Sequence, residues 1–346
     1  MTTLRVIIVG LGARSRTWMQ VLTNAAATQL VGLVDPNPDA LEHASTLAPY
    51  ALCGLDLASM DGVEADVVLL CTPPAGREQQ MEWCCTRGFG ILAEKPLATD
   101  LVTAARYVAM AEAAEVPLIV GLNFRYLEVT QKMRALLHSG AYGKMGFTRF
   151  TYERWRDGTQ QHLNKYPLTM DQPMLWEQSI HHFDLMRYVY GTDARRISAR
   201  TFNPEWSMYA GDANVSALID FKNDMHASYL GTWQGGLDRL DFDWRTDCSE
   251  GVVAQRGMFD DLYAGKRADG ELAPIALPPH EQWISDATAL WAMCHAAFCG
   301  TGPIDCSGRD HLQSLMMVQA CILSSEREAP VDLSEIEASL PSLKVS

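Results

Sequence analysis

Val6-Ile7-Ile8-Val9-Gly10-Leu11-Gly12-Ala13-Arg14-Ser15 decides the fold, because an apolar run leads directly into a glycine-rich turn. The run predicts a buried strand, and the stretch from Thr17 to Ala26 predicts a helix after the turn. The turn matches Gly-x-Gly-x-x-Gly except at Ser15, a position that requires only a small residue. The first glycine permits the tight bend, and the second lets the backbone approach a pyrophosphate at the helix N-terminus. We therefore expect a dinucleotide-binding site.

An acidic residue closes the second predicted strand, Leu30 to Val34. Asp35 follows Gly12 at the usual spacing of about 20 residues, where a carboxylate accepts hydrogen bonds from an adenosine ribose and repels a 2'-phosphate. Alternatively, Asp35 only opens a turn before Pro36. NAD is thus favoured as the cofactor, but Arg14 or Arg16 could reach a 2'-phosphate, which leaves NADP open.

The first third of the chain alternates short apolar runs with amphipathic stretches, which favours a parallel sheet covered by helices. Further strands are expected at 67–71, 91–93 and 118–121, and helices are expected to begin near Pro38, Gly76 and Asp100. We count six strands in one doubly wound Rossmann domain at residues 1–122.

The pattern changes after Asn123, where β-like runs dominate. Strands are expected at 147–153, 196–201, 215–221 and 226–232, with a hairpin turn at 222–224. A helix near 174–190 interrupts them, and helices at about 282–298 and 308–326 follow. The fold class is therefore α/β, with a Rossmann domain and, at residues 123–346, an α+β domain. This second domain has a large, mostly antiparallel open sheet and is expected to serve substrate binding and oligomerisation.

Composition and charge exclude several classes of protein. A chain of 346 residues exceeds the usual size of a single core, so two domains are expected. The formal charge of -14 would repel both a nucleic-acid backbone and an anionic membrane. The sequence contains neither a run of about 18 apolar residues nor a signal-peptide pattern. We expect a cytoplasmic protein with no nucleic-acid or membrane partner.

The nine cysteines favour reduced thiols, because their number is odd and the chain is too large to need disulfides. Cys84 and Cys85 are adjacent and cannot form a Cys-x-x-Cys pair. The cysteines and histidines between 294 and 311 lack a recognisable zinc spacing. We predict no metal site.

A lysine follows the strand expected at 91–93. In Glu94-Lys95-Pro96, Lys95 stands at the carboxyl edge of the sheet, where doubly wound folds bind ligands. Its ammonium could hydrogen-bond a substrate hydroxyl and help move its proton while hydride leaves the same carbon. The alternative is a surface lysine in a loop before a helix.

A second charged group lies on the helix expected near 174–190. Glu177 and His181 are four residues apart and His181 and Asp184 three apart, so two carboxylates could flank one imidazole. Such a histidine suits proton exchange near neutral pH. His182 points about 100° away on a helix, which favours a packing role.

Together these features resemble the glucose-fructose oxidoreductase, inositol dehydrogenase and rhizopine catabolism (Gfo/Idh/MocA) family. The resemblance spans nearly the whole chain and includes Thr72-Pro73-Pro74, the segment 121–126, the turn at 140–143 and the segment 177–184. Its most specific element is Glu94-Lys95-Pro96. Members oxidise or reduce sugars, inositols and related compounds at one ring carbon, usually with this Lys and a later His as the catalytic pair. The resemblance implies these roles for Lys95 and His181.

The candidate site residues follow from the motifs and the resemblance. As catalytic residues we predict Lys95, His181 and Glu177. As substrate-binding residues we predict His181 and, because aromatic rings and charged donors suit sugars, Arg125, Tyr126, Trp155 and Tyr166. The predicted cofactor-binding residues are Gly10, Gly12, Ala13, Arg14, Ser15, Asp35, Thr72, Pro73, Glu94 and Lys95.

Two positions depart from the family pattern. Glu177 stands where many members have Asp, and Arg77 stands where His is often found. The expected function is NAD(P)-dependent hydride transfer to or from a sugar, sugar acid or inositol-type polyol, in a homodimer or homotetramer. The alternatives are an NAD-dependent glycosidase and a non-catalytic nucleotide-sensing regulator on the same fold.

Overall fold

The opening apolar run forms the centre of a parallel sheet. In the computed structural model, which describes residues 2–340, β1 (Leu4–Val9) lies between β2 (Thr28–Val34) and β4 (Val67–Leu70). The strand order is β3-β2-β1-β4-β5-β6, completed by β3 (Leu52–Gly54), β5 (Gly90–Ala93) and β6 (Leu118–Val120). This is the predicted doubly wound Rossmann sheet. Of the six predicted strands, β3 is the one to which no residues were assigned from the sequence.

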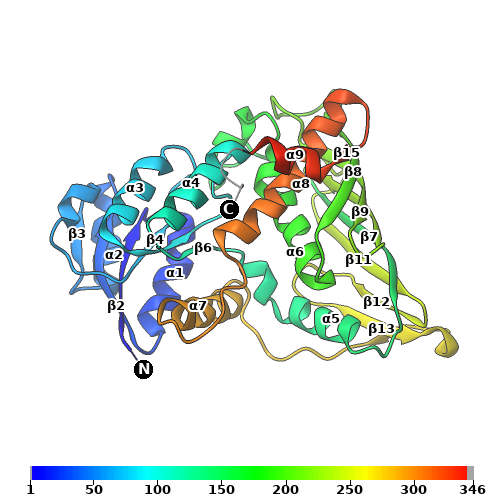
Figure 1. Cartoon of the computed structure of the whole chain (residues 1–346), viewed down its shortest axis with the longest axis horizontal. Coiled ribbons are helices and arrows are strands. Elements are labelled where there is room, and N and C mark those ends of the chain that lie inside the picture. The colour runs from blue at the N-terminus through cyan, green and yellow to red at the C-terminus, as the bar shows by residue number, and fades with distance from the viewer. Residues whose placement is uncertain (1, 341–346) are drawn as a thin grey trace. The chain divides into compact units, whose positions relative to one another are not determined.

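Helices cover both faces of this sheet, which explains why β4 and β5 are apolar throughout. Helices α1 (Ala13–Asn24) and α2 (Pro38–Leu47) contact each other, and so do α3 (Arg77–Arg87) and α4 (Leu101–Ala113) (Figure 1). Asn37 and Asp100 cap α2 and α4, because Asn37 accepts a hydrogen bond from Asp39 N and Asp100 accepts one from Thr103 N. A short 3-10 turn, η1 (Leu57–Met60), follows β3.

The first unit is discontinuous in sequence. Besides residues 2–126, it contains residues 280–312, with α7 (Ser285–Phe298). Trp291 Nε1 donates to Thr28 Oγ1 at 3.0 Å, and Val120 N donates to Cys306 O at 2.9 Å. The sequence-based boundary assigned residues 123–346 to one continuous domain. The structure differs because the buried face of α7 packs on the Rossmann side.

The second unit is built on a sheet of nine strands, ordered β14-β13-β12-β11-β7-β10-β9-β8-β15. All pairs are antiparallel except β7–β10, so the predicted mostly antiparallel sheet is confirmed. The predicted hairpin between β9 and β10 is also confirmed, with Asp224 in the left-handed region at φ 63°. The strands are β7 (Met145–Arg154), β8 (Ala194–Phe202), β9 (Asn214–Phe221), β10 (His226–Thr232), β11 (Leu240–Cys248), β12 (Gly251–Gln255), β13 (Leu262–Lys266), β14 (Ala273–Pro274) and β15 (Val331–Asp332).

Helices of this unit lie on one face of its sheet (Figure 1). The face beneath them carries large aromatic side chains, including Phe150, Tyr152, Tyr229 and Trp244. The helical elements of this unit are α5 (Glu128–His138), η3 (Tyr166–Thr169), η4 (Met174–Ser179), α6 (Ile180–Tyr190), η5 (Arg267–Asp269), α8 (Gly308–Arg327) and α9 (Leu333–Ser339). The short 3-10 turn η2 (Asn123–Tyr126) belongs to the first unit. Helix α8 belongs to this unit from residue 313 on.

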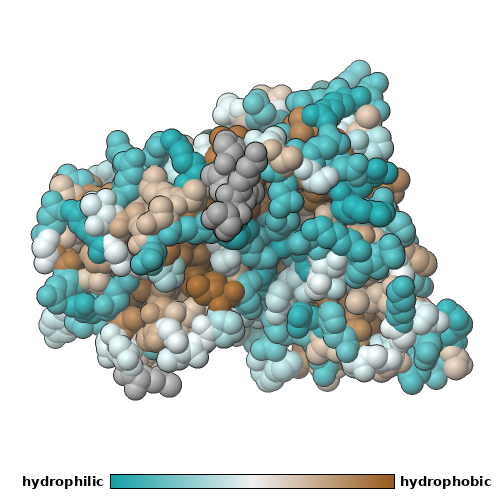
Figure 2. Space-filling view, in the orientation of Figure 1, coloured by the Kyte–Doolittle hydropathy of each residue, from teal (hydrophilic) through white to brown (hydrophobic). Residues whose placement is uncertain are grey.

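Hydrophilic residues cover most of the visible surface, with small apolar areas between them (Figure 2). Within residues 2–340, no helix combines the length and the apolar character that crossing a bilayer requires.

Candidate active site

The glycine turn has the geometry that its sequence predicts. Gly10 has φ +90°, and a Cβ on it would lie 2.9 Å from Thr72 N, so only glycine fits. At Gly12, a Cβ would meet no described atom within 4 Å, and the α1 N-terminus, which begins with Ala13, has no side-chain cap among the described residues. The first N–H groups of α1 thus fit a pyrophosphate.

Ser15 occupies the third motif position without disturbing it. Its side chain is buried, and its Oγ donates to Gly12 O at 2.7 Å. The buried hydroxyl therefore has a hydrogen-bond partner inside the turn, which explains why serine is tolerated where glycine is usual.

Asp35 is both a turn residue and a pocket residue. Its Oδ2 accepts from Leu11 N at 2.6 Å, and its Oδ1 accepts from Asn37 N at 2.8 Å. Beside it lies a pocket of ≈510 Å³ whose lining includes Ala13, Arg16 and His43. A pocket of this size next to the α1 N-terminus fits the nucleoside end of a dinucleotide.

The two arginines of the turn have different surroundings. Arg14 Nε donates to Glu94 Oε1 at 2.6 Å, and Trp18 Nε1 donates to the same oxygen at 2.7 Å. Burial opposes the charge of Arg14, but the Glu94 carboxylate outweighs this effect, so the pKa of Arg14 is raised. Arg16, not Arg14, lines the Asp35 pocket.

Arg77 binds the backbone around the candidate lysine. Its buried guanidinium donates to Thr72 O at 2.6 Å, to Glu94 O at 2.8 Å, to Pro96 O at 2.8 Å and to Leu97 O at 3.1 Å. Arginine has five donors in a fixed fork, which suits several carbonyls at once. The loop after β4, with Thr72 and Pro73, and the loop bearing Lys95 are thus joined by one side chain. Sequence reasoning noted Arg77 as a departure but did not find this role.

Glu177 and His181 lie on consecutive elements of the second unit. Glu177 is in η4, a π-helical turn, and His181 is in α6 with 6% of its surface exposed. π-helical turns occur frequently at functional sites. The candidate base is therefore on a helix and is nearly buried.

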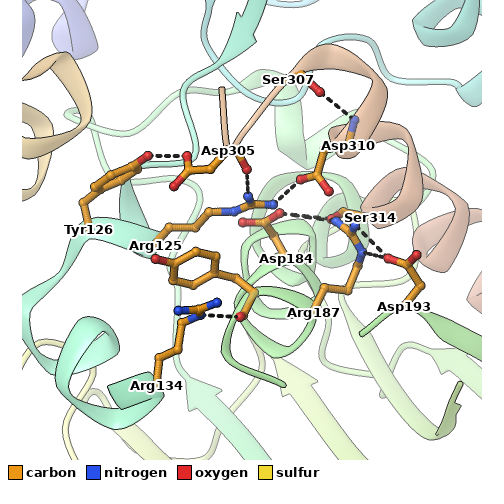
Figure 3. A network of polar contacts seen from close by, with 11 residues as sticks. Arg125, Tyr126, Arg134, Asp184, Arg187, Asp193, Asp305, Ser307, Asp310 and Ser314 are labelled. Carbon is orange, nitrogen blue, oxygen red and sulfur yellow. Dashed lines mark hydrogen bonds and ion pairs between the residues drawn. The ribbon is translucent and has the colours of Figure 1, made fainter. Parts of the chain in front are cut away.

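Asp184 is part of a buried network on the same helix. It accepts from Ser314 Oγ at 3.1 Å and lies 3.8 Å from Arg187 Nη1. Arg187 also binds Ser314 and Asp193, as Figure 3 shows. These contacts connect α6 to α8. That Asp184 also flanks His181 stays a prediction.

His182 is a packing residue, as expected. It is fully buried, and its ring centroid lies 4.8 Å from those of Phe150 and Tyr152. Its nitrogens contact Gln178 Nε2 at 3.0 Å and Tyr229 Oη at 2.8 Å. Burial lowers the pKa of His182 to about 3, so the imidazole is neutral.

Arg125 and Tyr126 bind the segment before α8. Arg125 donates to Asp305 O and to the Asp310 carboxylate, and Tyr126 Oη donates to the Asp305 carboxylate (Figure 3). Burial and these neighbours raise the pKa of Tyr126. The structure thus assigns both residues a structural role, and their predicted role in substrate binding is left untested.

Trp155 directly follows β7, and Tyr166 lies farther along the chain in η3. Trp155 forms an isolated antiparallel bridge with Gln234, and Tyr166 begins η3 with 37% of its surface exposed. Both stay candidates for substrate contact. Among residues 2–340, no three His, Cys, Asp or Glu side chains gather as a metal site would require.

Comparison with known proteins identifies the family. Residues 4–122 match the model described as "Oxidoreductase family, NAD-binding Rossmann fold", and residues 130–254 match "GFO/IDH/MocA C-terminal domain". The chain belongs to the Gfo/Idh/MocA family. It is an oxidoreductase with an NAD-binding Rossmann fold, as the resemblance predicted.

Named members of the Gfo/Idh/MocA family match along nearly the whole chain. D-apiose dehydrogenase of Paraburkholderia graminis is 25% identical, with 97% of this chain and 91% of that protein covered. Inositol 2-dehydrogenase of Rhizobium meliloti is 22% identical over 96% of this chain and 100% of its own. A solved oxidoreductase from Agrobacterium radiobacter, in complex with NAD+, L-tartaric acid and magnesium, has a TM-score of 0.86 at 20% identity and covers 97% of this chain and 100% of that chain. The structural match confirms the fold.

Proposed function

We propose that this oxidoreductase is an NAD-dependent dehydrogenase acting on a C–OH group of a sugar, a sugar acid or an inositol-type polyol. The observation that carries the proposal is internal to the first unit. A glycine turn, an Asp35 pocket and a lysine loop bound by Arg77 meet at the carboxyl ends of neighbouring parallel strands. Relatives named as D-apiose and inositol dehydrogenases support the substrate class.

The proposed chemistry divides between two side chains. Lys95 hydrogen-bonds the hydroxyl of the substrate and stabilises its negative charge as the proton leaves. His181 accepts that proton, and Glu177 orients the imidazole. When bound, NAD would supply the acceptor for the hydride that leaves the carbon bearing this hydroxyl. The proposal requires both side chains to reach one substrate molecule.

The activity test uses single variants of the two residues. Lys95→Ala and His181→Ala should each lower turnover by about a hundredfold or more, because general acid–base groups contribute on that order. Turnover is followed by the absorbance of reduced nicotinamide over a panel of aldoses, sugar acids and polyols. Lys132→Ala, which removes an exposed lysine on α5, is the matched control and should behave as the wild type.

Near wild-type turnover in either variant would remove that residue from the mechanism. Cleavage of a glycoside without net absorbance change would favour the glycosidase alternative. NAD binding without turnover of any substrate or glycoside would favour a nucleotide-sensing regulator.

We also propose that NAD is preferred over NADP. Asp35 has each carboxylate oxygen bound to a backbone N–H, which keeps a fixed negative charge in the pocket where a 2'-phosphate would lie. Asp35→Ser should therefore raise the ratio of kcat/KM with NADP to kcat/KM with NAD by about tenfold or more, with Arg16 available for the phosphate. Initial-rate kinetics with both cofactors measure this ratio. A wild-type enzyme that prefers NADP would overturn the proposal.

A further inference from the structure

Two arginines, Arg154 and Arg156, lie at and just beyond the carboxyl end of β7. Side chains alternate along a strand, and Phe150 and Tyr152 face the helix-covered side, where their rings contact His182. Arg154 shares this face by alternation, and Arg156 follows two residues later. Burial raises the pKa of Tyr152, whereas the charges of Arg154 and Arg156 both lower it.

Arg156 is held in one orientation by aromatic groups. Its guanidinium carbon lies 4.4 Å from the ring centroid of Trp233, which is 3% exposed. Its Nη1 donates to Tyr209 Oη at 3.2 Å, and its backbone N donates to Trp233 O at 3.0 Å. Stacking of this kind pre-organises the guanidinium while most of its N–H donors stay available.

Within residues 2–340, neither Arg154 nor Arg156 forms an ion pair with a carboxylate. Other arginines of this sheet do, as Arg149 does with Asp243 at 2.8 Å and Arg245 with Asp247 at 2.7 Å. The acidic residues next to them in sequence are Glu153 and Asp157. Glu153 points to the opposite face of β7 by alternation, and Asp157 binds Thr159. In a chain with 42 acidic and 28 basic side chains, two arginines that lie two residues apart and form no ion pair favour an external anion.

Strand β10 connects Trp233, on which Arg156 stacks, to the helical segment that bears the candidate catalytic residues. Tyr229 Oη on β10 donates to Ser179 Oγ, and two residues on, a Cβ at Gly231 would lie 2.6 Å from Met174 Cε. Strand β10 therefore passes beneath η4 towards its N-terminal end, and Trp233 follows the strand directly. Trp233, on which Arg156 stacks, thus lies two residues beyond the strand position that meets Met174 of η4, the element that carries Glu177.

We infer that Arg154 and Arg156 bind a carboxylate of the substrate, which makes the substrate an aldonic or uronic acid rather than a neutral sugar or polyol. This inference rests on the proposed dehydrogenase function and narrows its substrate class. A guanidinium matches a carboxylate with two parallel hydrogen bonds, and a second guanidinium offsets the remaining charge. Trp233 and Tyr209 hold the guanidinium of Arg156 in place before the substrate binds.

The kinetic test compares acids with neutral partners of the same stereochemistry: D-glucuronate with D-glucose, D-galacturonate with D-galactose, and D-gluconate with D-sorbitol. Wild-type kcat/KM should be at least about tenfold higher for an acid than for its partner. Arg154→Gln and Arg156→Gln should each raise KM for the acid about 10- to 100-fold with little change in kcat, because charge-assisted hydrogen bonds are lost in ground state and transition state alike.

The controls separate this inference from neighbouring explanations. Arg149→Gln removes an ion-paired arginine from the same strand and should leave KM for the acid unchanged. Preference for a neutral polyol, with both variants kinetically normal, overturns the inference while the dehydrogenase stands. A changed oligomeric state with normal KM also overturns it, because the arginines would then pair with a second copy of the chain.

Direct binding distinguishes failure of the inference from failure of the proposed function. Titration of D-glucuronate, D-galacturonate and D-gluconate into the NAD-loaded protein should show binding of at least one acid that both Gln variants weaken. Binding that depends on the arginines but gives no turnover would support the carboxylate site and contradict the dehydrogenase. Absence of acid binding to the wild type overturns the carboxylate site.

Discussion

The Glu94-Lys95 segment shows how single residues determine the position of a candidate catalytic group. The Glu94 carboxylate is bound by Arg14 and Trp18, and its carbonyl is bound by Arg77. Lys95 follows directly, so its backbone is held through its neighbour from two helices, α1 and α3. Arg77 is therefore a positioning residue.

Arg77→Met leaves the carbonyls of Thr72, Glu94, Pro96 and Leu97 without this donor. We expect kcat/KM to fall about tenfold or more, because misplacement of a catalytic group is costly. Arg77→His keeps a side chain that can donate a hydrogen bond to one of these carbonyls and should restore part of the activity. A double-mutant cycle with Lys95→Ala tests this role, because Arg77→Met should lower kcat/KM little further in a protein that already lacks the Lys95 side chain.

Full additivity of the two losses would contradict the positioning role. A lower melting temperature alone, with unchanged kcat/KM, would leave Arg77 a purely structural residue.

At the residue scale, sequence could predict what local motifs encode. Gly10, Ser15 and Asp35 belong to one short pattern, and the structure places them around one pocket and turn. The contacts of Arg77 and of Arg156 could not be predicted, because their partners lie far along the chain or are backbone atoms. Family resemblance marked Arg77 as unusual, but only the fold shows which carbonyls it meets.

At the element scale, strands with strong alternation and apolar content were predicted well, and β10 matches its predicted range at both ends. Strand β11 was missed, although Leu240, Phe242 and Trp244 alternate with acidic residues. Helix α5 was also missed, despite the i, i+4, i+8 spacing of Val129, Met133 and Leu137. Charged residues between apolar ones obscured both patterns.

Helix α6 makes the stability of the second unit depend on pH through His182. The folded pKa is lowered from 6.5 to about 3, so only the unfolded chain binds a proton between these values. The stabilising contribution is complete above pH 6.5 and is lost as the pH falls towards 3. From pH 7 to pH 5 the loss from this group is about 2 kcal/mol.

His182→Gln should remove this loss. We expect the free energy of unfolding, measured by chemical denaturation at pH 7 and pH 5, to fall by about 2 kcal/mol less in the variant than in the wild type. His162→Gln replaces an exposed histidine and should leave the pH dependence unchanged. An equal pH dependence in His182→Gln would show that His182 is protonated in the folded state as well.

At the scale of the whole molecule, we propose a homodimer or homotetramer formed through the sheet of the second unit. Phe147 on β7 and Leu218 on β9 leave 59% and 65% of their surfaces exposed. Large exposed apolar side chains support an interaction surface. The cytoplasmic location expected from the sequence stays a prediction.

Leu218→Glu should lower the molar mass measured by light scattering, because a buried carboxylate without a partner opposes association. Leu237→Glu, at an exposed loop residue, is the control. A monomeric wild type would contradict the oligomer.

The return of residues 280–312 to the first unit has a consequence for synthesis. The first unit is interrupted in sequence by residues 127–279 of the second unit, and Val120 meets its partner Cys306 only after those residues have been made. During translation, the nucleotide-binding unit therefore stays incomplete until residue 312 has been made. Residues 313–340, which complete the second unit, are made later still, so the first unit is the first that can finish folding, because domains generally fold as units during synthesis.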